Sequence, residues 1–159
     1  MNSYFFKQQG VNMKKSIFTL VLALVAFSAS AVDLSISNGR DYKVDKDYVK
    51  AALGTDYLGL KVAATYQTVD KGYKAFGAQV GKSFDVPKIK DLSFGPVVGV
   101  QYFNPQHGAG SYVASAGGVV SYALSKTAAV TLDLTRRLNM DSVNTFSGNQ
   151  AGLGLAVSF

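Results

Sequence analysis

The chain has 159 residues, with 16 glycines, nine tyrosines and ten phenylalanines, and it contains no cysteine, tryptophan or glutamate. The lack of cysteine excludes a disulfide-stapled domain, and the abundance of Val, Thr, Tyr and Phe favours strands over helices. The formal charge of +6 falls to +3 if Lys7, Lys14 and Lys15 are removed with an N-terminal leader. The other cations lie near expected turns and form no basic stripe, so we expect no nucleic-acid partner.

The N-terminal 31 residues have the three parts of a secretory signal peptide. Lys14 and Lys15 follow Met13, residues 17–27 are apolar, and Ala29-Ser30-Ala31 is a small-residue cleavage site. Eleven apolar residues are too few for a transmembrane helix, which needs about 20. The sequence therefore predicts an N-terminal extension and signal peptide at 1–31, with Met1 or Met13 as the start, and one exported domain at 32–159.

We predict that the mature chain begins at Val32, because Ala29 and Ala31 occupy the positions that signal peptidase reads. N-terminal sequencing of protein from the membrane fraction tests this. Retention of residues 1–31 would contradict an exported protein.

The rest of the chain alternates apolar with small or polar residues in eight segments, which is typical of strands. We place the strands at residues 32–38, 47–53, 57–68, 73–84, 92–103, 111–123, 127–137 and 149–159. An even number of strands with both ends on one side is what a bacterial transmembrane barrel requires. The sequence thus predicts an all-β fold, an eight-stranded antiparallel transmembrane β-barrel.

The connections divide into two sets. Three turns are expected on the side of the chain ends, at 54–56, 85–91 and 124–127, and four loops on the opposite side, at 38–46, 69–72, 104–110 and 138–148. The aromatic residues then form two girdles, a feature of membrane barrels. They are Phe84, Phe94, Tyr122 and Phe159 near the chain ends, and Tyr66, Phe76, Tyr102 and Tyr112 near the loops.

A soluble β-sandwich or lipocalin-like barrel also alternates, but with its apolar face inward. Here the less apolar face is rich in Gly, Ser, Thr and Gln rather than charge, which favours a packed lumen. Its predicted lumen-facing members are Lys61, Gln67, Gln79, Gln101, Asp133 and Arg137. A lumen of eight strands is only wide enough for side chains. We expect Lys61 and Asp133 to pair across it and close it; a narrow polar path for solutes is the alternative.

The last ten residues end on a bare aromatic strand. They resemble the C-terminal assembly signal of outer-membrane β-barrels through Gln150, Gly152, Leu155, Val157 and Phe159. With the leader, this pattern resembles the small eight-stranded families: OmpX-like, opacity-type and OmpA-type membrane domains. The resemblance implies the Gram-negative outer membrane, and outer-membrane lipid, lipopolysaccharide, periplasmic chaperones and the barrel-assembly machinery as partners.

A second resemblance covers the last third of the chain. Residues 122–127 and the strand that follows look like a periplasmic hairpin of β-proteobacterial general porins. Because 128 residues cannot make a sixteen-stranded barrel, this supports the membrane-barrel class more than a porin function.

Catalytic chemistry has little to use. Without glutamate, the Ser-His-Glu set of barrel lipid A deacylases cannot be assembled; His107, the single histidine, could act with an Asp and a Ser as in barrel acyltransferases, and no metal or cofactor motif is present. We therefore expect a non-enzymatic barrel with a structural or surface-interaction role and an unknown extracellular partner. A minor porin and, more distantly, a lipid A-modifying enzyme are the alternatives. Cations near the loops could contact lipopolysaccharide phosphates: Arg40, Lys43, Lys46, Lys71, Lys74 and Arg136.

Overall fold

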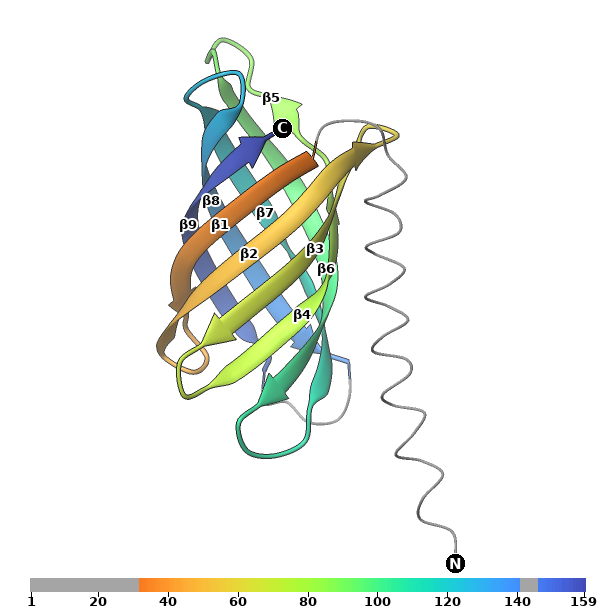
Figure 1. Cartoon of the computed structure of the whole chain (residues 1–159), viewed down its shortest axis with the longest axis vertical. Helices are drawn as coiled ribbons and strands as arrows, with labels where there is room; N and C mark the ends of the chain where they lie inside the picture. The colour runs from red at the N-terminus through yellow and green to blue at the C-terminus, as the bar shows by residue number, and fades with distance from the viewer. Residues whose placement is uncertain (1–31, 141–145) are drawn as a thin grey trace, which may run out of the picture.

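The computed structural model describes residues 32–140 and 146–159, so the predicted leader lies outside the described residues. The strands are β1 Val32–Asp41, β2 Lys46–Tyr57, β3 Leu60–Val69, β4 Tyr73–Gly81, β5 Phe84–Asp85, β6 Leu92–Pro105, β7 Ser111–Ala123, β8 Ala128–Asn139 and β9 Gly148–Ser158. Each neighbouring pair is antiparallel, and the pairing of β1 with β9 closes the ring (Figure 1). In the described part of the chain, no helix has the length and apolar character needed to cross a membrane.

Strands β4 and β5 together occupy one strand position in the barrel wall. Gly81 pairs with Val97 and Phe84 pairs with Phe94, so the two strands have the same register against β6. Between them, the Lys82 amide still donates to the Pro96 carbonyl at 3.2 Å. The fold is therefore a closed eight-stranded antiparallel barrel, and the predicted fold class is confirmed.

The register also determines how far the strands are staggered. A path of directly paired residues runs round the wall through Val32, Thr55, Val62, Val80, Val98, Ala116, Arg136 and Asn149. The path does not return to Val32. It reaches the first strand again at its loop end, beside Tyr42, whose amide donates to the Asn149 carbonyl at 3.1 Å. Because this stagger fixes the strand tilt, a step from β6 toward β9 also moves toward the loops.

The two ends of the barrel differ. At one, here called the terminal end, Val32 and Phe159 exchange backbone hydrogen bonds of 3.3 and 3.0 Å. The β2–β3, β5–β6 and β7–β8 turns lie at this end, and the β1–β2, β3–β4, β6–β7 and β8–β9 connections lie at the opposite, loop end (Figure 1). This division of turns and loops agrees with the predicted one.

The predicted turn at 54–56 is wrong. Those residues belong to β2, and the turn is made by Leu58 and Gly59, whose φ values are 52° and 77°. Gly54 and Asp56 are typical turn residues, but Gly54 is a strand position where a Cβ would lie 2.9 Å from the Val62 carbonyl oxygen. Leu58 therefore lies in the turn rather than on the outward face of β3.

The first loop is also shorter than predicted. β1 continues to Asp41 and β2 begins at Lys46, which leaves only 42–45 outside the ladder. The paired ladder overrides the turn-forming character of Asn38 and Gly39, which pair with Val49 and Tyr48.

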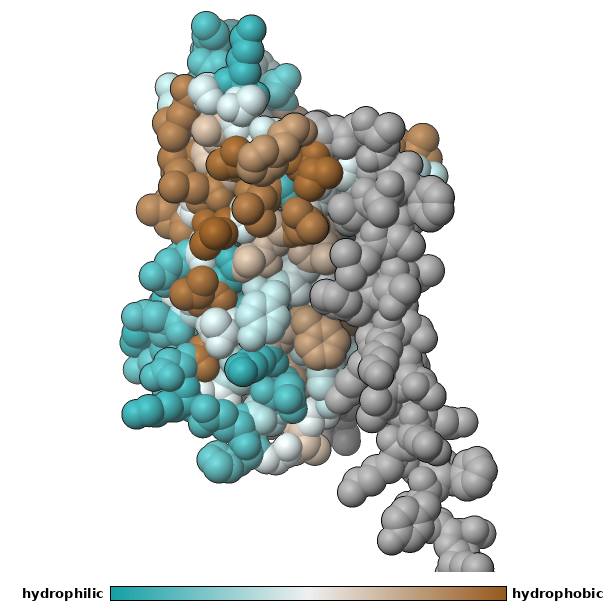
Figure 2. Space-filling model, in the orientation of Figure 1, coloured by the Kyte–Doolittle hydropathy of each residue, from teal (hydrophilic) through white to brown (hydrophobic). Residues whose placement is uncertain are grey.

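The outward face is apolar. Val98 and Leu153 are 57% and 61% exposed, while the alternate positions face the lumen. Figure 2 shows a hydrophobic band over β9, β1 and β2 near the terminal end, and hydrophilic residues toward the loop end. The predicted girdles lie at opposite ends: Phe84 contacts Phe94 at 6.0 Å between ring centroids, and Tyr102 contacts Phe76 and Tyr112 at 5.5 and 5.1 Å.

A charge on the outward face should destabilise the barrel more than the same charge one residue away. We expect Val98→Arg to cost about 2–4 kcal/mol, because Val98 lies in the middle of the apolar row of β6. Val97→Arg is the matched control, since Val97 lines an open cavity in the lumen. Urea unfolding in lipid vesicles measures both free energies; equal losses would contradict lipid contact at Val98.

Candidate functional site in the barrel lumen

The alternation of each strand directs one row of side chains into the lumen. Of the six residues predicted there, four are almost fully buried: Gln67 (1% exposed), Gln101 (7%), Asp133 (7%) and Arg137 (1%). Lys61 and Gln79 line the inner cavity. The structure thus places all six on the lumen side of the wall, but it distributes them over three levels.

The level nearest the loops is built around an ion pair. Arg137 on β8 donates through Nη2 to both carboxylate oxygens of Asp41 on β1, at 2.8 and 2.7 Å, and neither side chain is exposed. The Tyr73 hydroxyl donates to the same carboxylate and accepts from Arg137 Nη1 at 2.9 Å. Breaking a buried pair leaves an uncompensated charge, so these groups depend on one another.

Two amides complete the hydrogen bonding of this level. Gln67 donates to the Tyr73 hydroxyl at 2.8 Å, and Gln150 donates to it at 3.0 Å and to Asp41 at 3.3 Å. The backbone amides of Lys43 and Val44 also donate to Asp41, at 3.0 and 3.4 Å. Asp41 is therefore held from β8, β9 and its own loop.

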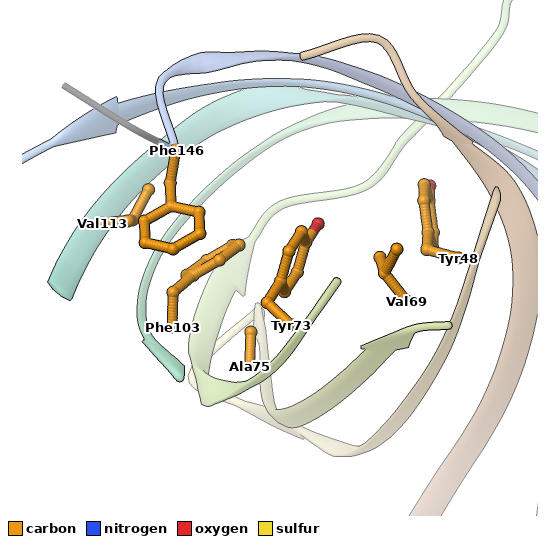
Figure 3. Packing of buried hydrophobic residues seen from close by; sticks show 7 residues of the cluster. All are labelled: Tyr48, Val69, Tyr73, Ala75, Phe103, Val113 and Phe146. Carbon is orange, nitrogen blue, oxygen red and sulfur yellow. The ribbon is translucent and has the colours of Figure 1, made fainter. Parts of the chain in front are cut away.

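Aromatic rings fill the rest of this level. Figure 3 shows Phe146, Phe103 and Tyr73 adjacent to one another across the lumen; centroids are 5.0 Å apart for Phe103 and Phe146, and 4.6 Å for Tyr73 and Phe103. The Arg137 guanidinium carbon lies 5.0 Å from the Phe103 centroid, within cation–π distance. We call the set Asp41, Tyr73, Phe103, Arg137, Phe146 and Gln150 the plug.

A second level lies next to the plug, on the side of the terminal end. The Tyr48 hydroxyl donates to Asp133 at 3.2 Å, and Gln101 donates to Thr65 at 3.0 Å. Tyr48 lies against Gly39 and Gly152, where an added Cβ would collide with its ring or hydroxyl. The glycines of β1 and β9 thus make room for a large aromatic side chain inside a narrow barrel.

The third level is open. A cavity of about 600 Å³ extends from the terminal end into the lumen, and its walls carry lysines, aspartates and many hydroxyl groups. Lys61 lies here, with its Nζ at 2.8 Å from Asp33 and 3.3 Å from Asp56. The predicted Lys61–Asp133 pair is therefore wrong: Lys61 pairs with carboxylates on β2 and β1, and Asp133 accepts from Tyr48 instead.

Sequence reasoning missed most of the plug. Asp41 continues the inward row of β1 through Asp33, Ser35, Ser37 and Gly39, but the predicted strand ends at residue 38 and leaves Asp41 in a loop. Tyr73 and Phe103 occupy inward positions of strands that were predicted correctly, so their alternation was available as a signal. Phe146 lies outside any strand and carried no such signal.

The described residues show no catalytic or metal arrangement. His107 is exposed in the β6–β7 loop, and no hydrogen bond joins it to a described serine or aspartate. In residues 32–140 and 146–159, no three His, Cys, Asp or Glu side chains are grouped to hold a metal ion. What the lumen offers chemically is a buried, charge-compensated and hydrogen-bonded cluster beside an open polar cavity.

The sequence matches no protein-family model and no curated protein. Solved structures are similar in fold. The N-terminal β-barrel domain of Pseudomonas aeruginosa OprF has a TM-score of 0.66 at 15% identity, over 82% of this chain and 98% of that one. Neisserial surface protein A gives 0.54 at 16%, over 81% and 95%. The Yersinia pestis outer membrane protein Ail gives 0.52 at 9%, over 82% and 99%. The chain therefore has the fold of the small outer-membrane β-barrels.

Proposed function

We propose that this protein is an integral outer-membrane β-barrel with a closed lumen and a structural or surface-interaction role. The outward apolar wall, the two aromatic girdles and the fold of its structural neighbours support the membrane placement. The single observation that carries the closed state is the plug, whose Arg137 and Asp41 side chains are completely buried.

The plug separates two very different regions. On its loop side the three fully described connections, at 42–45, 70–72 and 106–110, are short, and on its other side the lumen opens into the 600 Å³ cavity. A cavity that ends against a sealed level is a vestibule rather than a channel. The protein in this proposal faces the periplasm with the vestibule and the exterior with its loops, where an extracellular partner would bind.

No enzymatic role belongs to this proposal. A lipid A-modifying activity would need a nucleophile and a base at hydrogen-bonding distance. The exposed position of His107 gives no support for that arrangement.

Single-channel recording in planar bilayers tests the closed state, and the wild type should give no steady conductance. As a control, Phe103→Ala with Phe146→Ala removes two rings from the plug but leaves its charges paired, and this variant should give measurable, reproducible leaks. A stable open pore in the wild type would overturn the closed barrel and favour the alternative, a minor porin for small solutes.

A further inference from the structure

One cation interrupts the apolar outer wall of β8. The outward row of this strand runs through Leu132, Leu134, Arg136 and Leu138, and the leucines on either side of the arginine are 56% and 54% exposed. Beyond Leu138, Met140 is 62% exposed as well. Arg136 therefore lies within the apolar row and not at its edge.

The register gives the depth of Arg136 independently. It pairs with Ala116 on β7, which pairs with Val98 in the middle of the β6 row. Ala116 is four residues from Tyr112 of the loop-end girdle. Because each step toward β9 moves toward the loops, Arg136 lies between the middle of the wall and that girdle.

Arg136 has no ion pair or hydrogen bond with any described residue, unlike the other outward arginine. Arg40 on β1 contacts Asp45 at 2.6 Å and Asp47 at 3.0 Å. A guanidinium on a lipid-facing wall is unfavourable unless an anion or the headgroup layer receives it. The side chain of Arg136 thus lacks the compensation that Arg40 has.

A second hydrogen-bond donor lies beside it. Asn149 on β9 is the direct cross-strand partner of Arg136 and is also exposed on the outer wall. Side chains of directly paired residues start about 4.5–5.5 Å apart at Cβ, so both can reach the same group. A guanidinium next to an amide donor matches the oxygens of a phosphate, which arginine binds in a bidentate manner.

We propose that Arg136 and Asn149 bind a phosphate of an outer-leaflet glycolipid of the lipid A class. This inference rests on the proposed outer-membrane placement. A phosphate carried by a lipid fits the site, because Leu138 and Met140 add exposed apolar surface on its loop side. A second copy of the chain would be a poorer partner through Asp45 or Asp47, since both carboxylates already pair with Arg40.

The test is a lipid titration of the full mature chain in phosphatidylcholine nanodiscs, followed by native mass spectrometry. The added probes are bisphosphorylated lipid A, dephosphorylated lipid A and phosphatidylglycerol. We expect the wild type to bind the phosphorylated form about tenfold or more tightly than the dephosphorylated one, since a hydrogen bond to a charged group contributes about 1.5–3 kcal/mol.

The variants separate this site from general surface charge. Arg136→Leu should lose the phosphate preference, Arg136→Lys should lose part of it, and Lys74→Leu should keep it, because Lys74 is an outward cation on β4, across the barrel. The proposal is overturned if Arg136→Leu keeps the preference, if Lys74→Leu loses as much, or if phosphatidylglycerol binds as well as lipid A. The proposal is also overturned if native mass spectrometry shows a dimer of the chain that is lost in Arg136→Leu. Conductance of the wild type, measured separately, would refute the closed barrel without affecting this result.

Discussion

Replacing Arg137 with leucine is expected to destabilise the barrel by about 3–5 kcal/mol, because Asp41 would remain buried without its cation. The carboxylate would keep the Tyr73 hydroxyl and the Gln150 amide, but neither carries a positive charge. The free energy of unfolding, measured with urea in lipid vesicles, gives the size of the effect. Asp41→Leu should destabilise the barrel by a comparable amount, because it leaves the Arg137 guanidinium buried without its carboxylate.

Arg40→Leu is the matched control for Arg137→Leu. Arg40 makes two ion pairs and its side chain is 42% exposed, whereas the Arg137 side chain is completely buried. Exposed pairs are screened by water and contribute little, so the unfolding midpoint of Arg40→Leu should hardly move. Equal losses in the two variants would mean that burial does not control the strength of the Arg137 pair.

The double variant, with leucine at both 41 and 137, should recover much of the stability that either single variant loses. Neither charge is then buried without its partner, and replacing a buried ion pair with apolar residues often leaves the stability unchanged or raises it. The recovery is a coupling free energy from a double-mutant cycle. Additive losses would show that Asp41 and Arg137 act independently, contrary to their direct contact.

The wall of the barrel could be predicted because alternation is a local property. The alternation of residues 92–103 predicts Gln101 on the lumen side, and Gln101 is 7% exposed, whereas Val98, at the opposite parity of the same row, is 57% exposed. In a strand the side-chain period is two, so one correctly placed residue assigns all the others.

The plug could not be predicted in the same way, because its contacts join residues far apart in the chain. Asp41 and Arg137 are 96 positions apart, and only closure of the ring brings β1 next to β9 and near β8. Without that geometry, Lys61 and Asp133 were an equally reasonable pair of opposite charges. Their separate partners depend on the stagger of the strands, which no single segment encodes.

Strand ends were the other source of error. Asn38 and Gly39 favour a turn by residue type, yet they remain in the ladder because β2 and β9 pair with β1 on both sides. Leu58 is the opposite case: the predicted strand 57–68 includes it, but it occupies a turn with φ of 52°. Local preference is weak compared with the pairing of a closed ring.

The second large effect is expected at the end of the chain. Deleting Phe159, or replacing it with a charged residue, should block insertion into the outer membrane. Burying one phenylalanine contributes roughly 1.5–3 kcal/mol, which alone would seldom prevent folding. A block of that kind would therefore come from loss of a recognition signal, and heat-modifiable gel mobility of outer-membrane fractions measures it.

Phe159 is a better probe of this signal than Gln150 or Gly152, which belong to the same predicted signal. Gln150 and Gly152 face the lumen, where the first hydrogen-bonds Tyr73 and the second lies against Tyr48, so their variants would disturb the packing as well. The Phe159 side chain is 77% exposed on the outer wall. Phe94→Ala removes a ring from the same girdle and should insert normally; equal defects in the two variants, or normal insertion without Phe159, would show that the terminal aromatic acts only as one more lipid contact.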